Sequence, residues 1–123
     1  MDSPLERNFD LIWLAIGGPR LEKEFRFHGG RKWRFDRALV REKIAFEIEG
    51  GTWSGGRHTS GIGFRNDCEK DNCALALGWR VFRLTSEMVS VSYMRALLVA
   101  LGAGSAIDFK FPSRRRRRKA RAL

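Results

Sequence analysis

The sequence predicts an α+β fold in which helices cover a mixed β-sheet. Two observations predict it: short segments in which apolar and polar residues alternate, typical of strands, and longer segments bounded by capping or glycine signals, typical of helices. In chain order these segments read helix, three strands, helix, strand and helix. A length of 123 residues and a hydrophobic content of 43% suit one packed domain. Because a helix precedes the last strand, we expect that strand to pair parallel to one of the first three.

The first half of the chain predicts one helix and three strands. Ser3 is a favourable N-cap, Pro4 fits the first helical turn, and Gly17 ends the helical pattern. A glycine pair at 29–30 and a turn over 40–43 separate the strands that follow. The strands are expected over residues 22–28, 32–40 and 43–51.

The second half begins with a loop rich in Gly, Ser and Thr, after which residues 64–77 have helical character. Gly78 is a natural stop for this helix. Its apolar stripe consists of Phe64, Cys68 and Leu75. We expect this stripe to pack on the sheet.

A strand over residues 79–85 and a helix over 86–102, N-capped by Ser86, complete the predicted domain. The apolar residues of interest on this helix segment are Met88, Leu97, Leu98 and Leu101. We expect them to close the chain's own core. The alternative is that they pair with a second copy of the chain and make a homodimer.

Positive charge is concentrated near the C-terminus. The chain has 24 Lys and Arg against 14 Asp and Glu, a net charge of +10, and seven of the basic residues lie in the stretch RRRRRKAR. We expect a folded domain over residues 1–112 and a basic tail over 113–123 that is disordered without a partner. Such a tail favours nucleic acid as the partner over an anionic membrane surface. The residues expected to contact phosphates are Arg114, Arg115, Arg116, Arg117, Arg118 and Lys119.

Several classes of protein are excluded. No stretch reaches eighteen apolar residues, and the N-terminus does not resemble a secretory signal. Cys68 and Cys73 would lie roughly 8 to 9 Å apart on a helix, beyond disulfide reach. Two cysteines and two histidines without paired spacing disfavour a structural zinc site. We therefore expect a reducing, cytoplasmic setting.

The chemistry is predicted on the hairpin of the second and third strands. A turn over 40–43 places Leu39 opposite Ile44 and Asp36 opposite Glu47. One face would then hold Trp33, Phe35, Leu39, Ile44, Phe46 and Ile48. The other would hold Arg34, Asp36, Ala38, Ala45, Glu47 and Glu49.

Three carboxylates on one face repel one another unless a cation offsets them. A hard divalent ion with oxygen ligands would do so, with Mg²⁺ favoured over Mn²⁺. The small residues Ala38 and Ala45 leave room for a ligand. The alternative is an exposed polar face, neutralised by Arg26, Arg34 and Lys43.

The order αβββαβ, an Asp on the second strand and Glu-x-Glu on the third resemble the PD-(D/E)XK nuclease superfamily, and within it the small bacterial and phage enzymes related to very-short-patch-repair endonucleases. The resemblance spans about residues 6–88. It implies a restriction-endonuclease-like core and a metal-dependent DNA endonuclease that leaves 5′-phosphate and 3′-hydroxyl ends. Such an enzyme would act in DNA repair, recombination or phage DNA processing, in the cytoplasm of a bacterial or phage-infected cell. The alternative is a non-catalytic nucleic-acid-binding protein with a nuclease-like fold.

The resemblance implies that Asp36, Glu47 and the Ile48 carbonyl hold the metal, and that Glu6 matches an acidic residue of the family's first helix. The chain departs from the family at Glu49, where the pattern has lysine. Lys70 could replace that lysine, although a helical wheel places it about 120° from the apolar stripe of its helix. Glu49 could instead be an extra ligand or orient water.

The loop before the second helix carries one further candidate. The resemblance implies a histidine near this loop, and His58 could take a proton from water. The alternative is a solvated histidine, or one that binds phosphate beside Arg57.

Overall fold

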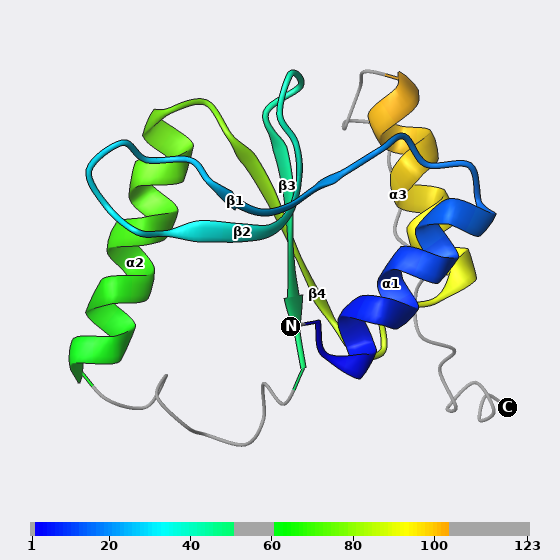
Figure 1. The fold of residues 1–123 in the computed structure, drawn as a ribbon, viewed down its shortest axis with the longest axis horizontal. Helices are drawn as coiled ribbons and strands as arrows, with labels where there is room; N and C mark the ends of the chain where they lie inside the picture. The colour runs from blue at the N-terminus through cyan, green and yellow to red at the C-terminus, as the bar shows by residue number, and fades with distance from the viewer. Residues whose placement is uncertain (1, 51–60, 104–123) are drawn as a thin grey trace, which may run out of the picture.

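The computed structural model describes residues 2–50 and 61–103 of the chain. In these ranges it contains three helices and a four-stranded mixed sheet (Figure 1). The elements are α1 (Pro4–Ala15), β1 (Glu22–Arg26), β2 (Arg34–Leu39), β3 (Ile44–Glu49), α2 (Gly61–Ala76), β4 (Arg80–Thr85) and α3 (Val91–Ala103). The prediction of an α+β fold with a mixed sheet flanked by helices is confirmed.

The strands follow their chain order across the sheet, β1-β2-β3-β4. The first three are antiparallel neighbours, and β4 pairs parallel to β3 after the α2 crossover, as predicted. Leu39 lies opposite Ile44 and Ala38 opposite Ala45, so the predicted register of the β2–β3 hairpin is correct. The predicted cap of α1 is also present, because the Ser3 side chain accepts a hydrogen bond from the Glu6 N–H.

The sheet separates two apolar layers, with α1 and α3 on one side and α2 on the other (Figure 1). The larger cluster of buried side chains joins α1 and α3 to the sheet and consists of Phe9, Trp13, Leu39, Ile44, Phe46, Leu84, Val89, Met94 and Leu97. The smaller cluster lies on the α2 side and consists of Phe35, Ala38, Ala45, Ala74 and Trp79. Helix α3 therefore contributes its buried side chains to the chain's own core.

One face assignment was wrong: Phe35 lies on the α2 side, not with Leu39. The break in alternation lies opposite Glu24 of the neighbouring strand, whose φ is +49°. On one side of Glu24, Lys23 is paired with Arg37, which bonds to α1. On its other side Phe25 is paired with Phe35. Trp33 lies on the same side of the sheet as Phe35, because both rings stack on Phe27.

The predicted apolar stripe of α2 was also wrong. Phe64 is 61% exposed and Leu75 is 74% exposed, whereas Ala74 is 1% exposed. The inward face therefore runs through Ala74 and Lys70, which are four residues apart and share one side of a helix. The Lys70 ammonium lies 5.7 Å from the centroid of the Phe35 ring. A small residue and an aliphatic lysine stem fill the narrow space against the sheet.

Helix α3 begins at Val91, not near Ser86. The Ser90 hydroxyl accepts a hydrogen bond from the Tyr93 N–H at 3.3 Å, so Ser90 caps the helix. Cys68 and Cys73 are free thiols, as expected. Across residues 2–50 and 61–103, no helix has the length and apolar character needed to cross a membrane.

Candidate functional site

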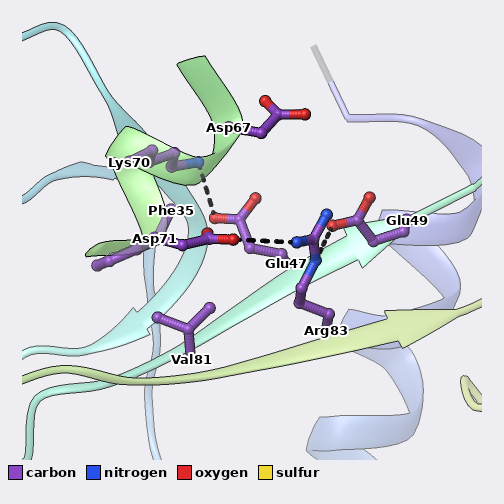
Figure 2. Close-up of a pocket in the computed structure, with 8 residues that line it drawn as sticks. All are labelled: Phe35, Glu47, Glu49, Asp67, Lys70, Asp71, Val81 and Arg83. Carbon is purple, nitrogen blue, oxygen red and sulfur yellow. Dashed lines mark hydrogen bonds and ion pairs between the residues drawn. The ribbon is translucent and has the colours of Figure 1, made fainter. Parts of the chain in front are cut away.

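A small pocket opens between β3, β4 and α2, with a volume of about 100 Å³ (Figure 2). Its lining residues are Phe35, Glu47, Glu49, Asp67, Lys70, Asp71, Val81 and Arg83. Three of the predicted site residues, Glu47, Glu49 and Lys70, are among them. Helix α2 and strand β3 bring them together because Lys70 belongs to the inward face of its helix.

Glu47 is the most perturbed carboxyl group of the pocket. Its side chain is 17% exposed, and the Lys70 ammonium lies 3.3 Å from its Oε2. Burial, together with the charges of Asp36 and Glu49, raises the pKa of Glu47 to about 7, although the neighbouring Lys70 ammonium opposes the rise. The pocket thus holds a carboxyl group whose negative charge is only partly compensated.

Asp36 lies beside Glu47 at the point where β2 separates from β3. The register pairs of the two strands extend from Leu39–Ile44 to Arg37–Phe46. The next residue of β2 is Asp36, and its side chain accepts a hydrogen bond from the Ile48 N–H at 2.8 Å. Burial raises the pKa of Asp36, although the Ile48 hydrogen bond opposes this. The predicted neighbourhood of Asp36 and Glu47 is present, because the charge of Asp36 acts on Glu47.

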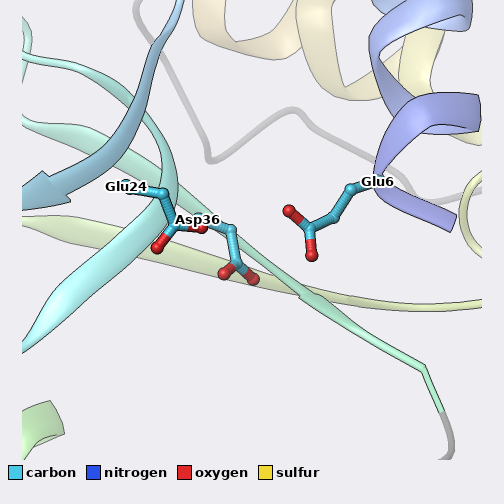
Figure 3. Close-up of side chains that lie close together, drawn as sticks. All are labelled: Glu6, Glu24 and Asp36. Carbon is cyan, nitrogen blue, oxygen red and sulfur yellow. The ribbon is translucent and has the colours of Figure 1, made fainter. Parts of the chain in front are cut away.

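Glu6 of α1 and Glu24 of β1 complete an acidic cluster around Asp36 (Figure 3). One carboxylate oxygen of each residue lies within 4.8 Å of the others. Sequence reasoning identified Glu6 but missed Glu24. The register of β1 and β2 would have found it, because Lys23 and Phe25 are paired with Arg37 and Phe35 on either side of Asp36.

Glu49 is bonded to a cation that the sequence did not single out. The Arg83 Nε donates to its Oε2 at 2.8 Å, and the Arg83 Nη1 lies 3.3 Å from Asp71 (Figure 2). Arg83 belongs to β4 and is the register partner of Glu47. Only the register between β3 and β4 reveals this position, and the sequence analysis did not predict that register.

Arg37 forms a second set of charges, on the α1 side of the sheet. Its side chain is 0% exposed and donates two hydrogen bonds of 2.8 Å to Asp10, one of 3.2 Å to Glu6 and one of 2.7 Å to the Asp36 carbonyl. These bonds fix α1 against β2 and orient Glu6 next to Asp36. Sequence reasoning did not assign Arg37 to either face of the hairpin and so missed this buried cation.

Three groups of predicted residues lie outside the described part of the chain. They are His58, Arg57, and the basic residues from Arg114 to Lys119. Ile48, predicted as a backbone ligand, lies on β3 between Glu47 and Glu49.

The donor set around Asp36 is compatible with a hard divalent cation. Glu6, Glu24 and Asp36 offer carboxylate oxygens, the type of ligand that Mg²⁺ and Mn²⁺ prefer. Two carboxyl groups with raised pKa values stand next to an ammonium group. Such an arrangement can bind a cation on its acidic side and a phosphate on its basic side. Comparisons with protein-family models, curated proteins and solved structures found no significant match to this chain.

Proposed function

We propose that this protein is a metal-dependent DNA endonuclease that hydrolyses phosphodiester bonds. The observation that carries the proposal is the meeting of Asp36, Glu47 and Lys70 from three separate elements. The Lys70 ammonium contacts Glu47 at 3.3 Å, and both carboxyl groups have raised pKa values. Maintaining two partly uncompensated carboxyl groups costs stability, and such groups are concentrated at functional sites.

Asp36 and Glu47 would hold Mg²⁺ or Mn²⁺, with the Ile48 carbonyl as a further ligand and Glu6 nearby. A divalent cation in this position would supply charge stabilisation to a phosphoryl oxygen and lower the pKa of water. The raised pKa values support this role, because a cation would offset the burial and the neighbouring negative charges that raise them.

Lys70 would contribute positive charge to the phosphate that is attacked. Its side chain is 23% exposed, and the ion pair with Glu47 orients its ammonium group. A donor fixed in advance stabilises developing charge without reorganisation during the reaction. This assigns to Lys70 the role that the PD-(D/E)XK pattern gives to a lysine at the position of Glu49.

A restriction-endonuclease-like core is part of the proposal. Asp36 on β2, Glu47 on β3, Lys70 on α2 and Glu6 on α1 occupy the elements on which the resemblance expects them. The ion pair between Glu49 and Arg83 supports an orienting role for Glu49, because its carboxylate already has a partner.

One observation favours a second candidate, a non-catalytic nucleic-acid-binding protein. Glu47 and Glu49 are each bonded to a cation of the chain itself, Lys70 and Arg83. These pairs offset part of the negative charge without a metal. Such a protein would bind DNA equally well with or without divalent cations.

The test is cleavage of labelled duplex, nicked and four-way DNA by the pure protein in Mg²⁺, in Mn²⁺ and in chelator. We expect cleavage that requires the cation and is lost in Glu47→Gln. Glu42→Gln is the matched control, because Glu42 is exposed in the turn between β2 and β3. Binding without cleavage by the wild type in either cation would favour the second candidate. Cleavage by Glu47→Gln at the wild-type rate would contradict the assigned site.

A further inference from the structure

The end of the β1–β2 hairpin forms a strongly basic surface. Residues 26–34, which we call the basic hairpin, have the sequence RFHGGRKWR, with four Arg or Lys and no acidic residue. Arg26, Arg31, Lys32 and Arg34 are all exposed. The surface is built from described residues and is separate from the basic C-terminal stretch.

The charges of the basic hairpin are arranged at a cost to stability. Arg26 and Arg34 are register partners across the two strands, and like charges placed opposite one another repel. Acidic neighbours compensate little: Arg34 lies 3.8 Å from Glu24 and Arg31 lies 3.9 Å from Glu69, and all four side chains are 44% exposed or more. An anionic partner would relieve this repulsion.

The hairpin is ordered by its own contacts. The His28 Nδ1 accepts the N–H groups of Gly30 and Arg31, each at 3.0 Å. The Arg31 guanidinium lies 3.9 Å from the centroid of the Trp33 ring, a cation–π contact that holds the charge in place. Arg26 donates to the Arg31 carbonyl at 3.3 Å. A surface fixed in this way loses little conformational freedom on binding.

A line of aromatic rings connects the hairpin to the pocket. Trp33 stacks on Phe27 with centroids 6.2 Å apart, and Phe27 stacks on Phe35 at 4.1 Å. Phe35 lines the pocket and lies beneath Lys70. In Figure 1 the loop between β1 and β2 lies beside α2, the helix that carries Lys70. A polyanion with one phosphate at the pocket could therefore extend along the hairpin.

We propose that the basic hairpin binds the phosphate backbone of duplex DNA on one side of the pocket. The inference rests on the proposed function for the choice of DNA, and it adds the surface that would hold the substrate. The charges are spread along exposed arginines and lysine, which suits contacts to phosphates. The contacts would carry no base sequence information.

The test compares binding of a labelled duplex of mixed sequence by full-length proteins in chelator, across a salt series. The hairpin variant carries Arg31→Ala, Lys32→Ala and Arg34→Ala, and a milder variant retains Arg31 and its contact with Trp33. The matched control removes the same number of charges elsewhere, through Arg20→Ala, Arg41→Ala and Arg95→Ala. With log Kd plotted against log salt, we expect the slope to flatten by about 2 to 3 in the hairpin variant, by about 1 to 2 in the milder one and by less than about 1 in the control.

Failure of this inference can be distinguished from failure of the proposed function. An unchanged slope in the hairpin variant overturns the inference, even if the wild type cleaves DNA. A flattened slope with no cleavage by the wild type supports the inference and contradicts the nuclease. Binding to phosphatidylserine vesicles is measured with the same proteins. If the hairpin variant loses vesicle binding but keeps its DNA binding, the inference is overturned in favour of a membrane surface as the partner. A wild type that binds no DNA at any salt concentration overturns both.

Discussion

Two groups of charged residues in this protein look alike in composition and differ in electrostatics. The Arg37 cluster consists of Arg37 with Asp2, Glu6 and Asp10, and the Glu47 cluster consists of Asp36, Glu47, Glu49 and Lys70. In the Arg37 cluster, bonds to Lys23 and Arg37 lower the pKa of Asp2, and bonds to Asp10 raise the pKa of Arg37. In the Glu47 cluster, burial raises the pKa values of Asp36 and Glu47.

The difference separates a group with a structural role from a group that we propose binds a cation. The buried Arg37 guanidinium has a raised pKa and donates hydrogen bonds to Asp10 and Glu6, so the charges of the Arg37 cluster are compensated largely within the cluster. Raised pKa values of the acids show that the Glu47 cluster still favours the arrival of a proton or a cation. Glu6 links the two, because it bonds to Arg37 and also lies in the acidic cluster around Asp36.

The largest expected effect is on the Arg37 cluster. Arg37→Met would leave Asp10 and Glu6 close together without their buried partner, and removing one member of a buried ion pair costs about 3 to 5 kcal/mol. We expect the free energy of unfolding in urea to fall by that amount. Lys23→Met is the control: Lys23 bonds to Asp2 at the exposed edge of the cluster, so its loss should have a much smaller effect. Equal losses in the two variants would contradict a structural core formed by Arg37.

The next effect is the pH dependence that Glu47 imposes on stability. The pKa of its carboxyl group is raised from 4.5 to about 7 in the folded protein, so the folded state binds more protons than the unfolded state between these values. Stability is therefore highest below the unfolded pKa and falls as the pH rises through about 7. The full change is about 3 kcal/mol, at about 1.36 kcal/mol per pKa unit.

The measurement is urea unfolding in chelator from about pH 5 to pH 8, since a bound cation would remove the effect. Glu47→Gln cannot ionise, so its stability should change less over this range than that of the wild type. The raised pKa of Asp36 contributes in the same direction, starting from its unfolded value of 3.8. A wild type whose stability rises with pH in this window would place Glu47 with the satisfied acids of the Arg37 cluster.

The sequence was sufficient to predict most of the fold. The elements, the β2–β3 register and the parallel last strand follow from alternation, turn residues and the crossover helix, which are local signals. It also identified Asp36 and Glu47, because acidic residues on neighbouring strands stand out in the pattern, whereas Glu6 on α1 was identified only through the family resemblance.

The errors share one physical cause. Phe35, Lys70 and Arg37 all occupy positions decided by packing between elements rather than by local periodicity. The alternation changes face opposite Glu24, a residue with positive φ, and α2 buries Ala74 against the sheet while it leaves the larger Phe64 and Leu75 exposed. The pairings of Arg37 and Arg83 join segments far apart in the chain, and no pattern within one segment reveals them.

The third effect is on cleavage. Lys70→Ala should lower the single-turnover rate by about a hundredfold, the usual loss when one fixed electrostatic contact to the transition state is removed. Arg80→Ala is the control, because it removes one exposed positive charge from β4 without touching the pocket. An undiminished rate in Lys70→Ala would leave Glu49 or His58 as the better candidate and would make the Glu47–Lys70 contact a structural one.

The smallest effect concerns Arg83, which shares one feature with the Arg37 cluster and differs from it in another. It is bonded to Glu49 at 2.8 Å, like a member of the Arg37 cluster, yet its side chain is 48% exposed. A solvent-exposed ion pair contributes about 0 to 1 kcal/mol, because water and salt screen it. A double-mutant cycle of Arg83→Met and Glu49→Gln, measured by urea unfolding, should therefore give a coupling free energy below about 1 kcal/mol. A coupling of about 3 kcal/mol would instead be typical of a buried pair. In that case Glu49 would belong to the structural group, and the Glu47 cluster would be reduced to the groups that the proposed reaction uses directly: Asp36, Glu47 and Lys70.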